Sequence, residues 1–189
     1  MTNPRDPHWW RTLSRKTLAT MLAEGHSIDR TALADTVYKG ISLGLPSFVE
    51  ALSWVVFAKT FQYVPATYTL RGWNVRCEQT PLEAPVKYRT KKDGSVETFG
   101  PYTVREIRES DARPRPYREG LMIDYSMEGH ARGSMARTRD PIVAIEAGSA
   151  DVLLGWSWIS VGKGGLSTPS YFALLRERPL DHQHPFDGG

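Results

Sequence analysis

Two apolar patterns of helical type occupy the N-terminal third of the chain. The first covers residues 9–24, where Asp6-Pro7 is a helix-start signal and apolar residues share one broad side. The second covers residues 47–63, where Ser47 and Glu50 form a capping box. Apolar residues then follow almost all round, with Lys59 as the main charged exception. We therefore expect two helices, the second of them buried on more than one side.

From Thr67 onward the pattern alternates with period two and is interrupted by glycine and proline. Apolar runs at a spacing of roughly ten residues predict seven or eight strands between residues 67 and 177. Asp93-Gly94 predicts a hairpin, and Gly72 predicts a bulge that brings Leu70 and Trp73 to one face. No helical pattern separates the strands, so the expected fold is mainly β, an up-and-down barrel or a sandwich.

The length of 189 residues and a hydrophobic share of 40% fit one domain, which we expect to span residues 1–178. Residues 179–189 are polar, and we expect a flexible tail there. No apolar stretch is long enough for a membrane span, and the N-terminus lacks the apolar segment of a secretory signal. With a single cysteine, these features predict a cytoplasmic protein. They leave the oligomeric state open.

Most familiar chemical motifs are missing from the sequence. The 24 basic residues are nearly balanced by 21 acidic ones, so we expect no nucleic-acid partner. Cys77 lies in an apolar strand pattern and is expected to be a buried, inert thiol. His182 and His184 lack a third ligand, and the glycines at 162–165 lack the spacing of a phosphate loop. We therefore expect neither a metal nor a cofactor.

Aromatic residues are spread over most of the predicted elements. Alternate residues of a barrel strand point inward, and inward Trp and Tyr form an apolar wall with a few polar donors, as in many small-molecule pockets. The alternative is that they simply fill the core. The candidate ligand-binding residues are Tyr38, Trp54, Trp73, Tyr102, Trp156, Trp158 and Tyr171.

Asp124 is the leading candidate for acid–base chemistry, together with Tyr102 and His130. An inward Asp124 would be buried, and burial would raise its pKa. However, Ile123 and Tyr125 belong to the better apolar face, and this parity directs Asp124 outward or toward a structural partner.

Several short motifs carry a family resemblance. Tyr38-Lys39-Gly40 precedes Leu45-Pro46, Leu52-x-Trp54 and Lys59-x-Phe61; later come 151–155 and Pro169-x-Tyr171-Phe172. Over about residues 38–177 the chain resembles the bacterial domains named for a Gly-x-Trp-x-Gly motif, although Thr36, Tyr38 and Gly40 retain only its last glycine. The resemblance implies a calycin-type, lipocalin-like antiparallel barrel with an early helix. The activity of that family is uncharacterised, so no catalytic residue is carried over.

Three functions remain open from the sequence. The first is the binding of a small hydrophobic or aromatic molecule in a lipocalin-like barrel, with the N-terminal helix as a cover. The second is a cofactor-independent isomerase, cyclase or lyase that acts on a hydrophobic metabolite in the same cavity. The third is an interaction protein with a filled barrel, which uses the Trp9-Trp10 helix on a partner.

Overall fold

The computed structural model describes residues 3–44, 55–111, 116–117, 119–126, 133–162 and 164–182. In this part of the chain, two helices, α1 (Pro7–Arg11) and α2 (Arg15–Glu24), precede eight strands. The strands are β1 (Thr36–Leu43), β2 (Val56–Val64), β3 (Thr69–Arg76), β4 (Thr98–Glu106), β5 (Leu121–Asp124), β6 (Thr138–Ala144), β7 (Val152–Val161) and β8 (Gly164–Pro179). Three short 3-10 turns, η1 (Arg30–Leu33), η2 (Pro65–Thr67) and η3 (Met135–Arg137), lie between these elements.

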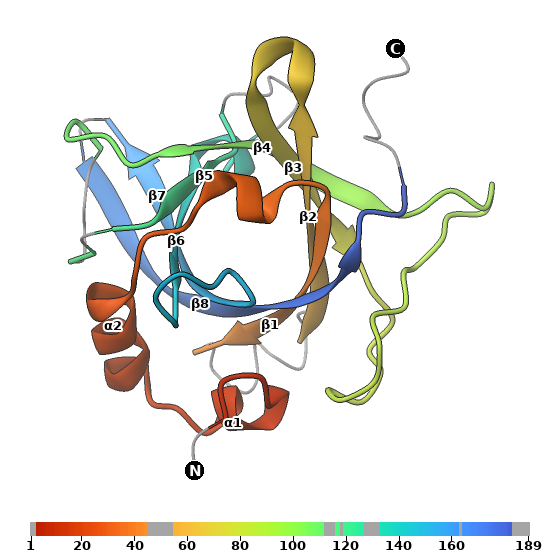
Figure 1. Ribbon diagram of the computed structural model, residues 1–189, viewed down its shortest axis with the longest axis horizontal. Coiled ribbons are helices and arrows are strands. Elements are labelled where there is room, and N and C mark those ends of the chain that lie inside the picture. The colour runs from red at the N-terminus through yellow and green to blue at the C-terminus, as the bar shows by residue number, and fades with distance from the viewer. Residues whose placement is uncertain are drawn as a thin grey trace.

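The eight strands form a closed antiparallel barrel in which each strand pairs with the next in sequence. The ring closes because β1 pairs with both β2 and β8, for example Gly40 with Phe57 on one side and with Leu174 on the other. In Figure 1 the strands surround a common axis, and both helices lie outside the ring. The predicted antiparallel barrel behind two N-terminal helices is thereby confirmed, and its topology is consistent with a lipocalin-like fold.

The predicted helix over residues 9–24 is divided into two. The side chain of Asp6 caps the start of α1 by accepting a hydrogen bond from the amide of His8. The helix ends at Arg11, and the hydroxyl of the next residue, Thr12, donates to the carbonyl of Trp9. Ser14 then caps α2 by accepting the amide of Thr17. A residue that serves as an N-cap has an extended backbone, so Ser14 separates the two helices.

The predicted helix over residues 47–63 is wrong where the structure describes it, because Val56–Val64 is strand β2. Residues 47–54 of this prediction lie outside the described residues. The apolar side chains of 56–61 follow one another without alternation because both faces of β2 are buried. A strand of this kind cannot be distinguished from a buried helix by its pattern. The barrel therefore begins at Thr36, earlier than the expected residue 67.

Apolar side chains pack in two separate layers, one inside the barrel and one outside it. The outer layer includes Trp10, Leu18 and Leu22 from the helices, together with Trp73, Val75 and Cys77 of the strand region. The inner layer includes Leu70, so Leu70 and Trp73 face opposite sides and the expected bulge at Gly72 does not bring them together. Further members of the inner layer are Tyr38, Phe61, Tyr102, Val104, Leu121, Ile123, Ile142, Leu153, Phe172 and Leu174.

One end of the barrel is closed by the segment that connects α2 to β1. Ile28 and Leu33 of this segment pack with the inner layer, and Figure 1 shows the turn η1 lying across the ring. The chain after β8 is also held in place, since Leu180 donates its amide to the carbonyl of Asp35 and His182 accepts from the indole of Trp73 at 2.9 Å. Residues 180–182 thus pack on the barrel.

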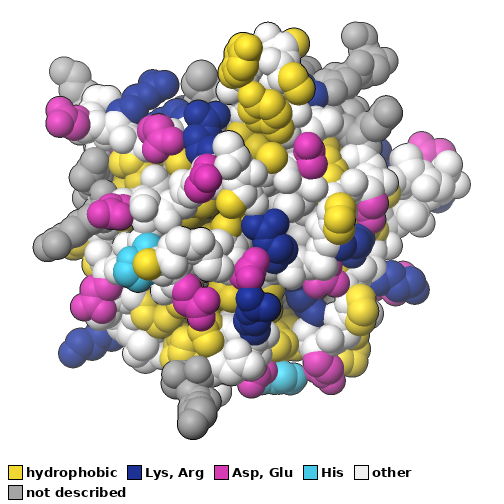
Figure 2. Space-filling model, in the orientation of Figure 1, with side chains coloured by type: hydrophobic (Ala, Val, Ile, Leu, Met, Phe, Trp, Pro, Cys, Tyr) yellow, Lys and Arg dark blue, Asp and Glu magenta, His cyan; other side chains and the backbone are white. Residues whose placement is uncertain are grey.

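The surface carries interspersed charges. On the face shown in Figure 2, basic and acidic side chains lie beside one another without a continuous area of either sign. This arrangement agrees with the small formal net charge of +3. Within the described ranges, neither helix combines the length and the apolar character needed to cross a bilayer.

Candidate functional site

A pocket of about 430 Å³ lies at the end of the barrel opposite η1. Its lining comes from the last residues of some strands and the first residues of others, which meet at one end of an antiparallel barrel. Ser42 is the second-last residue of β1, Phe57 and Phe99 are the second residues of β2 and β4, and Thr138 begins β6. Aromatic and aliphatic side chains form most of the wall: Phe57, Phe99, Tyr125, Met135, Ile159 and Phe172.

Two glycines make room for two of the aromatic rings of this wall. A Cβ atom on Gly40 would overlap the ring of Phe57, and a Cβ atom on Gly155 would overlap the ring of Phe172. The rings of Phe57 and Phe172 meet edge to face, with centroids 6.2 Å apart. Each ring therefore lies over the backbone of a neighbouring strand, where only glycine leaves enough space.

The floor of the pocket is polar and is centred on the ammonium group of Lys59. Its Nζ donates to Asn74 Oδ1 at 2.9 Å and to the hydroxyl of Tyr125 at 2.6 Å. It also lies 3.4 Å from Asp140 Oδ2, with which it forms an ion pair. The side chains of Lys59 and Asp140 are only 2% and 3% exposed. These four residues line the same pocket.

Aromatic faces surround the same ammonium group. Nζ of Lys59 lies 4.9 Å from the ring centroid of Tyr102, 5.1 Å from that of Tyr125 and 5.2 Å from that of Phe172. A cation at such distances is attracted by the negative face of the ring. The rings and the Asp140 carboxylate together compensate for the loss of water around Lys59.

Tyr125 connects the members of this polar cluster. Its hydroxyl donates to Asp140 Oδ2 at 3.1 Å and accepts from Lys59 Nζ and from Asn74 Nδ2. Asn74 Nδ2 also donates to the carbonyl of Gly100 at 3.1 Å. The second carboxylate oxygen of Asp140, Oδ1, is buried and accepts no hydrogen bond from any described residue. Oδ1 is therefore the unused polar atom of the cluster.

Burial shifts the proton affinities of the cluster. It lowers the pKa of Lys59, an effect that the Asp140 carboxylate opposes. Burial also raises the pKa of Tyr102 and that of Tyr125 well above the ordinary value, and the negative charge of Asp140 raises both further. Both phenols consequently stay protonated at neutral pH, and Tyr125 remains a hydrogen-bond donor.

Two of the aromatic residues predicted to bind a ligand point into the barrel, but below the pocket floor. Tyr38 donates its hydroxyl to the carbonyl of Ala150 at 2.7 Å, and Tyr102 donates to the carbonyl of Thr60 at 2.8 Å. Both are fully buried, and their rings flank Phe61. They fill the interior beneath Lys59 and do not line the pocket.

The predicted tryptophans lie elsewhere. Trp73, Trp156 and Trp158 belong to the outer layer beneath the helices and covering segments, so the expectation that they line the interior is wrong. Tyr171 also packs in the outer layer, where its ring lies 6.3 Å from that of Trp156, although it borders the pocket. Trp54 and His130 lie outside the described residues.

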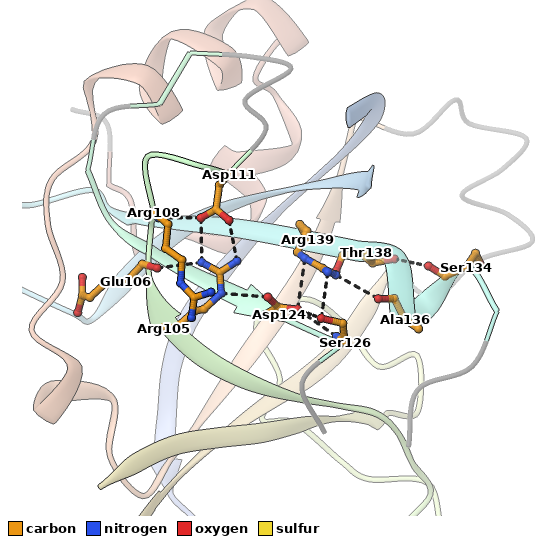
Figure 3. Close-up of polar contacts among 10 residues, drawn as sticks. All are labelled: Arg105, Glu106, Arg108, Asp111, Asp124, Ser126, Ser134, Ala136, Thr138 and Arg139. Carbon is orange, nitrogen blue, oxygen red and sulfur yellow. Dashed lines mark hydrogen bonds and ion pairs between the residues drawn. The ribbon is translucent and has the colours of Figure 1, made fainter. Parts of the chain in front are cut away.

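Asp124 lies outside the barrel interior, in a separate network of ion pairs between arginine and aspartate side chains (Figure 3). It accepts from Arg105 Nε at 2.9 Å and lies 3.2 Å from Arg139 Nε, and it also accepts the amide and hydroxyl of Ser126. Arg105 in turn forms a bidentate pair with Asp111, with both distances 2.8 Å. Burial raises the pKa of Asp124, but Ser126, Arg105 and Arg139 together hold it below the ordinary value. Asp124 is therefore an ionised, structurally paired carboxylate.

The single thiol of the chain lies outside this cluster. Cys77 is buried, and burial raises the pKa of its thiol to about 12. Across the described ranges no three His, Cys, Asp or Glu side chains are grouped to hold a metal ion.

Lys59, Asn74 and Asp140 are residues of the site that were not predicted from the sequence. The sequence carried a signal for two of them. Lys59 is a charged residue within the largely apolar segment 55–61, and Asp140 directly precedes the apolar segment 141–145. A charged residue on a doubly buried strand needs a partner.

Comparisons of the chain with protein-family models, with curated proteins and with solved structures find no match.

Proposed function

We propose that this protein binds a small apolar or aromatic molecule in the pocket at the open end of its barrel. The observation that supports the proposal is the combination of an aromatic wall with a buried polar cluster at the floor. Pockets that bind small molecules have this composition, in which apolar groups supply affinity and a few polar groups fix orientation. The resemblance to the bacterial Gly-x-Trp-x-Gly domains, with their lipocalin-like barrel, belongs to the same proposal.

The proposal is tested by filling the pocket. Ser157 lines it, while its neighbours Trp156 and Trp158 face outward. We expect 2-naphthol to bind the natural protein with one site in titration calorimetry, and Ser157→Phe to weaken binding by about tenfold or more. Ser160→Phe is the matched control, because Ser160 borders a different depression beside Trp158. Absence of naphthol binding, or equal effects of the two variants, would contradict the proposal.

Native mass spectrometry of protein purified from its own host provides a second test. A stoichiometric small molecule that is released on denaturation would support the proposal and reveal the chemistry of the ligand. If the protein carries none and also fails to bind naphthol, a role as an interaction protein becomes the better explanation.

A cofactor-independent isomerase, cyclase or lyase is the second candidate, because Tyr125 lies between the amine of Lys59 and the carboxylate of Asp140. Such a group can move a proton on a bound ligand. A ketone probe such as 2-tetralone in heavy water tests this candidate. Enzyme-dependent uptake of deuterium that is lost in Tyr125→Phe would support it. Uptake at the rate of the buffer alone would favour binding without turnover.

A further inference from the structure

We infer that the ligand of this pocket is an uncharged molecule with an apolar or aromatic body and one hydroxyl or N–H group. This polar group points to the pocket floor and donates a hydrogen bond to Asp140 Oδ1. The inference rests on the proposed binding function and adds the chemical class and the orientation of the ligand. It is carried by the count of donors and acceptors at the pocket floor.

The donors of the floor are already used. Lys59 has three N–H groups, and three oxygens surround its Nζ, from Asn74, Tyr125 and Asp140. Tyr125 donates its only proton to Asp140 Oδ2. The amide of Asn74 donates to Tyr125 and to the carbonyl of Gly100. A ligand that offers only acceptors, such as an ether or an ester, would therefore have to break one of these bonds.

One acceptor of the floor is unused. Asp140 Oδ1 is buried, and none of the described residues donates to it. A buried carboxylate oxygen without a donor is unfavourable, and a ligand hydroxyl or N–H group would satisfy it. Asp140 lines the pocket together with Phe57 and Phe172, and we expect the ligand to approach Oδ1 along this aromatic wall.

Charge excludes the ionic alternatives. The ammonium of Lys59 and the carboxylate of Asp140 balance each other within a wall of aromatic side chains. A ligand ion of either sign would lose its hydration on entering and would find no net opposite charge in this balanced pair to compensate for the loss. A neutral donor satisfies Oδ1 without adding a charge.

A matched series of ligands tests the inference on the natural protein. The probes are 2-naphthol, 2-methoxynaphthalene, 2-naphthoate and 2-naphthylmethylammonium, which share one aromatic body. We expect 2-naphthol to bind about tenfold or more tightly than the methyl ether, because only the hydroxyl donates to a charged acceptor. We expect both ions to bind more weakly than naphthol. Equal affinity for naphthol and its ether, or tighter binding of either ion, would overturn the inference.

A pair of variants locates the acceptor. Asp140→Leu alone leaves the ammonium of Lys59 without its ion partner, so Lys59→Met/Asp140→Leu is the variant used, with folding checked by cooperative unfolding. In this variant we expect naphthol and its ether to bind within about twofold of each other. A preserved preference for naphthol would place the acceptor elsewhere and overturn the assignment. If the variant does not fold, the ligand series on the natural protein decides.

The series also separates the two levels of the proposal. Equal binding of naphthol and its ether, abolished by Ser157→Phe, would leave the binding function standing and remove the donor inference alone. Absence of binding by all four probes would overturn both.

Discussion

Lys59 and Asp140, which are 81 positions apart in sequence, form an ion pair inside the barrel with Nζ 3.4 Å from Oδ2. Lys59 comes from β2 and Asp140 from β6, strands that are not neighbours in the sheet. The pair therefore spans the interior, and it separates a filled lower half of the barrel from an open upper pocket.

The first prediction concerns the stability of this pair. Lys59→Met leaves a buried carboxylate without its ion partner and is expected to lower the free energy of unfolding by about 3–5 kcal/mol. Lys59→Met/Asp140→Leu removes both charges and is expected to recover most of that loss. Urea unfolding of the two single variants and the double variant measures the coupling. Additive effects of the single substitutions would show that the pair is not coupled.

The second prediction compares two glycines of the inner face. A Cβ atom on Gly155 would overlap the ring of Phe172, whereas one on Gly72 would overlap the backbone carbonyl of Thr60. The ring of Phe172 can rotate away, whereas the hydrogen-bonded backbone of Thr60 cannot move aside. Gly155→Ala is therefore expected to lower the free energy of unfolding by about 1–3 kcal/mol, and Gly72→Ala is expected to lower it by more. Thermal unfolding measures both.

Phe172→Leu provides the control for this comparison. It shortens the side chain that meets Gly155 and is expected to reduce the effect of Gly155→Ala, while leaving that of Gly72→Ala unchanged. Rescue of both glycine variants by Phe172→Leu would contradict the assignment of separate contacts.

The third prediction concerns acid stability. The pKa of Asp124 is held below its ordinary value in the folded protein, so its contribution to stability is present above the unfolded pKa of about 4 and is lost as the pH falls through the folded pKa. Asp124→Asn is expected to lower the free energy of unfolding by about 1.5–3 kcal/mol at pH 7. The difference between the two proteins should shrink progressively below about pH 4, as urea unfolding at several pH values would show.

Asp93→Asn serves as the control for the third prediction. Asp93 is also held at a lowered pKa, by Ser95, but it lies on the exposed hairpin. Its substitution should have a much smaller effect at pH 7. A pH-independent loss of stability in Asp124→Asn would indicate that the charge of Asp124 is not what matters.

The fourth prediction concerns the single thiol. Cys77 is 1% exposed, and burial raises its pKa to about 12. At pH 8 roughly one native thiol in ten thousand is ionised, against about one in four for an ordinary cysteine. Labelling by an aromatic disulfide reagent should therefore be at least about a thousandfold slower in the native protein than in urea.

An exposed cysteine calibrates the reagent. Ser95 lies at the exposed hairpin, so Ser95→Cys in a Cys77→Ala background should react at nearly the same rate with and without urea. Fast labelling of native Cys77 would mean that the structure around this thiol opens readily by local unfolding.

The mainly β class of the fold follows from the sequence pattern alone. Period-two alternation with regular turn signals is typical of strands, and the absence of helical patterns between them favours antiparallel neighbours. The capping signals at Asp6 and the hairpin signal at Asp93-Gly94 are local, so they also appear in the structure, where Gly94 has a φ of +81°. The buried state of Cys77 follows from its apolar strand neighbours in the same way.

Which face of each strand points into the barrel cannot be read from the sequence and depends on the closed fold. Along β1, β2, the middle of β3 and the first half of β7 both faces are buried, so apolar character does not distinguish the inner face from the outer one. The same double burial made β2 resemble a helix, and it made Trp73, Trp156 and Trp158 resemble pocket residues. The partners of Lys59 come from β3, β6 and the end of β5, and closure of the barrel, which no local pattern encodes, brings them together.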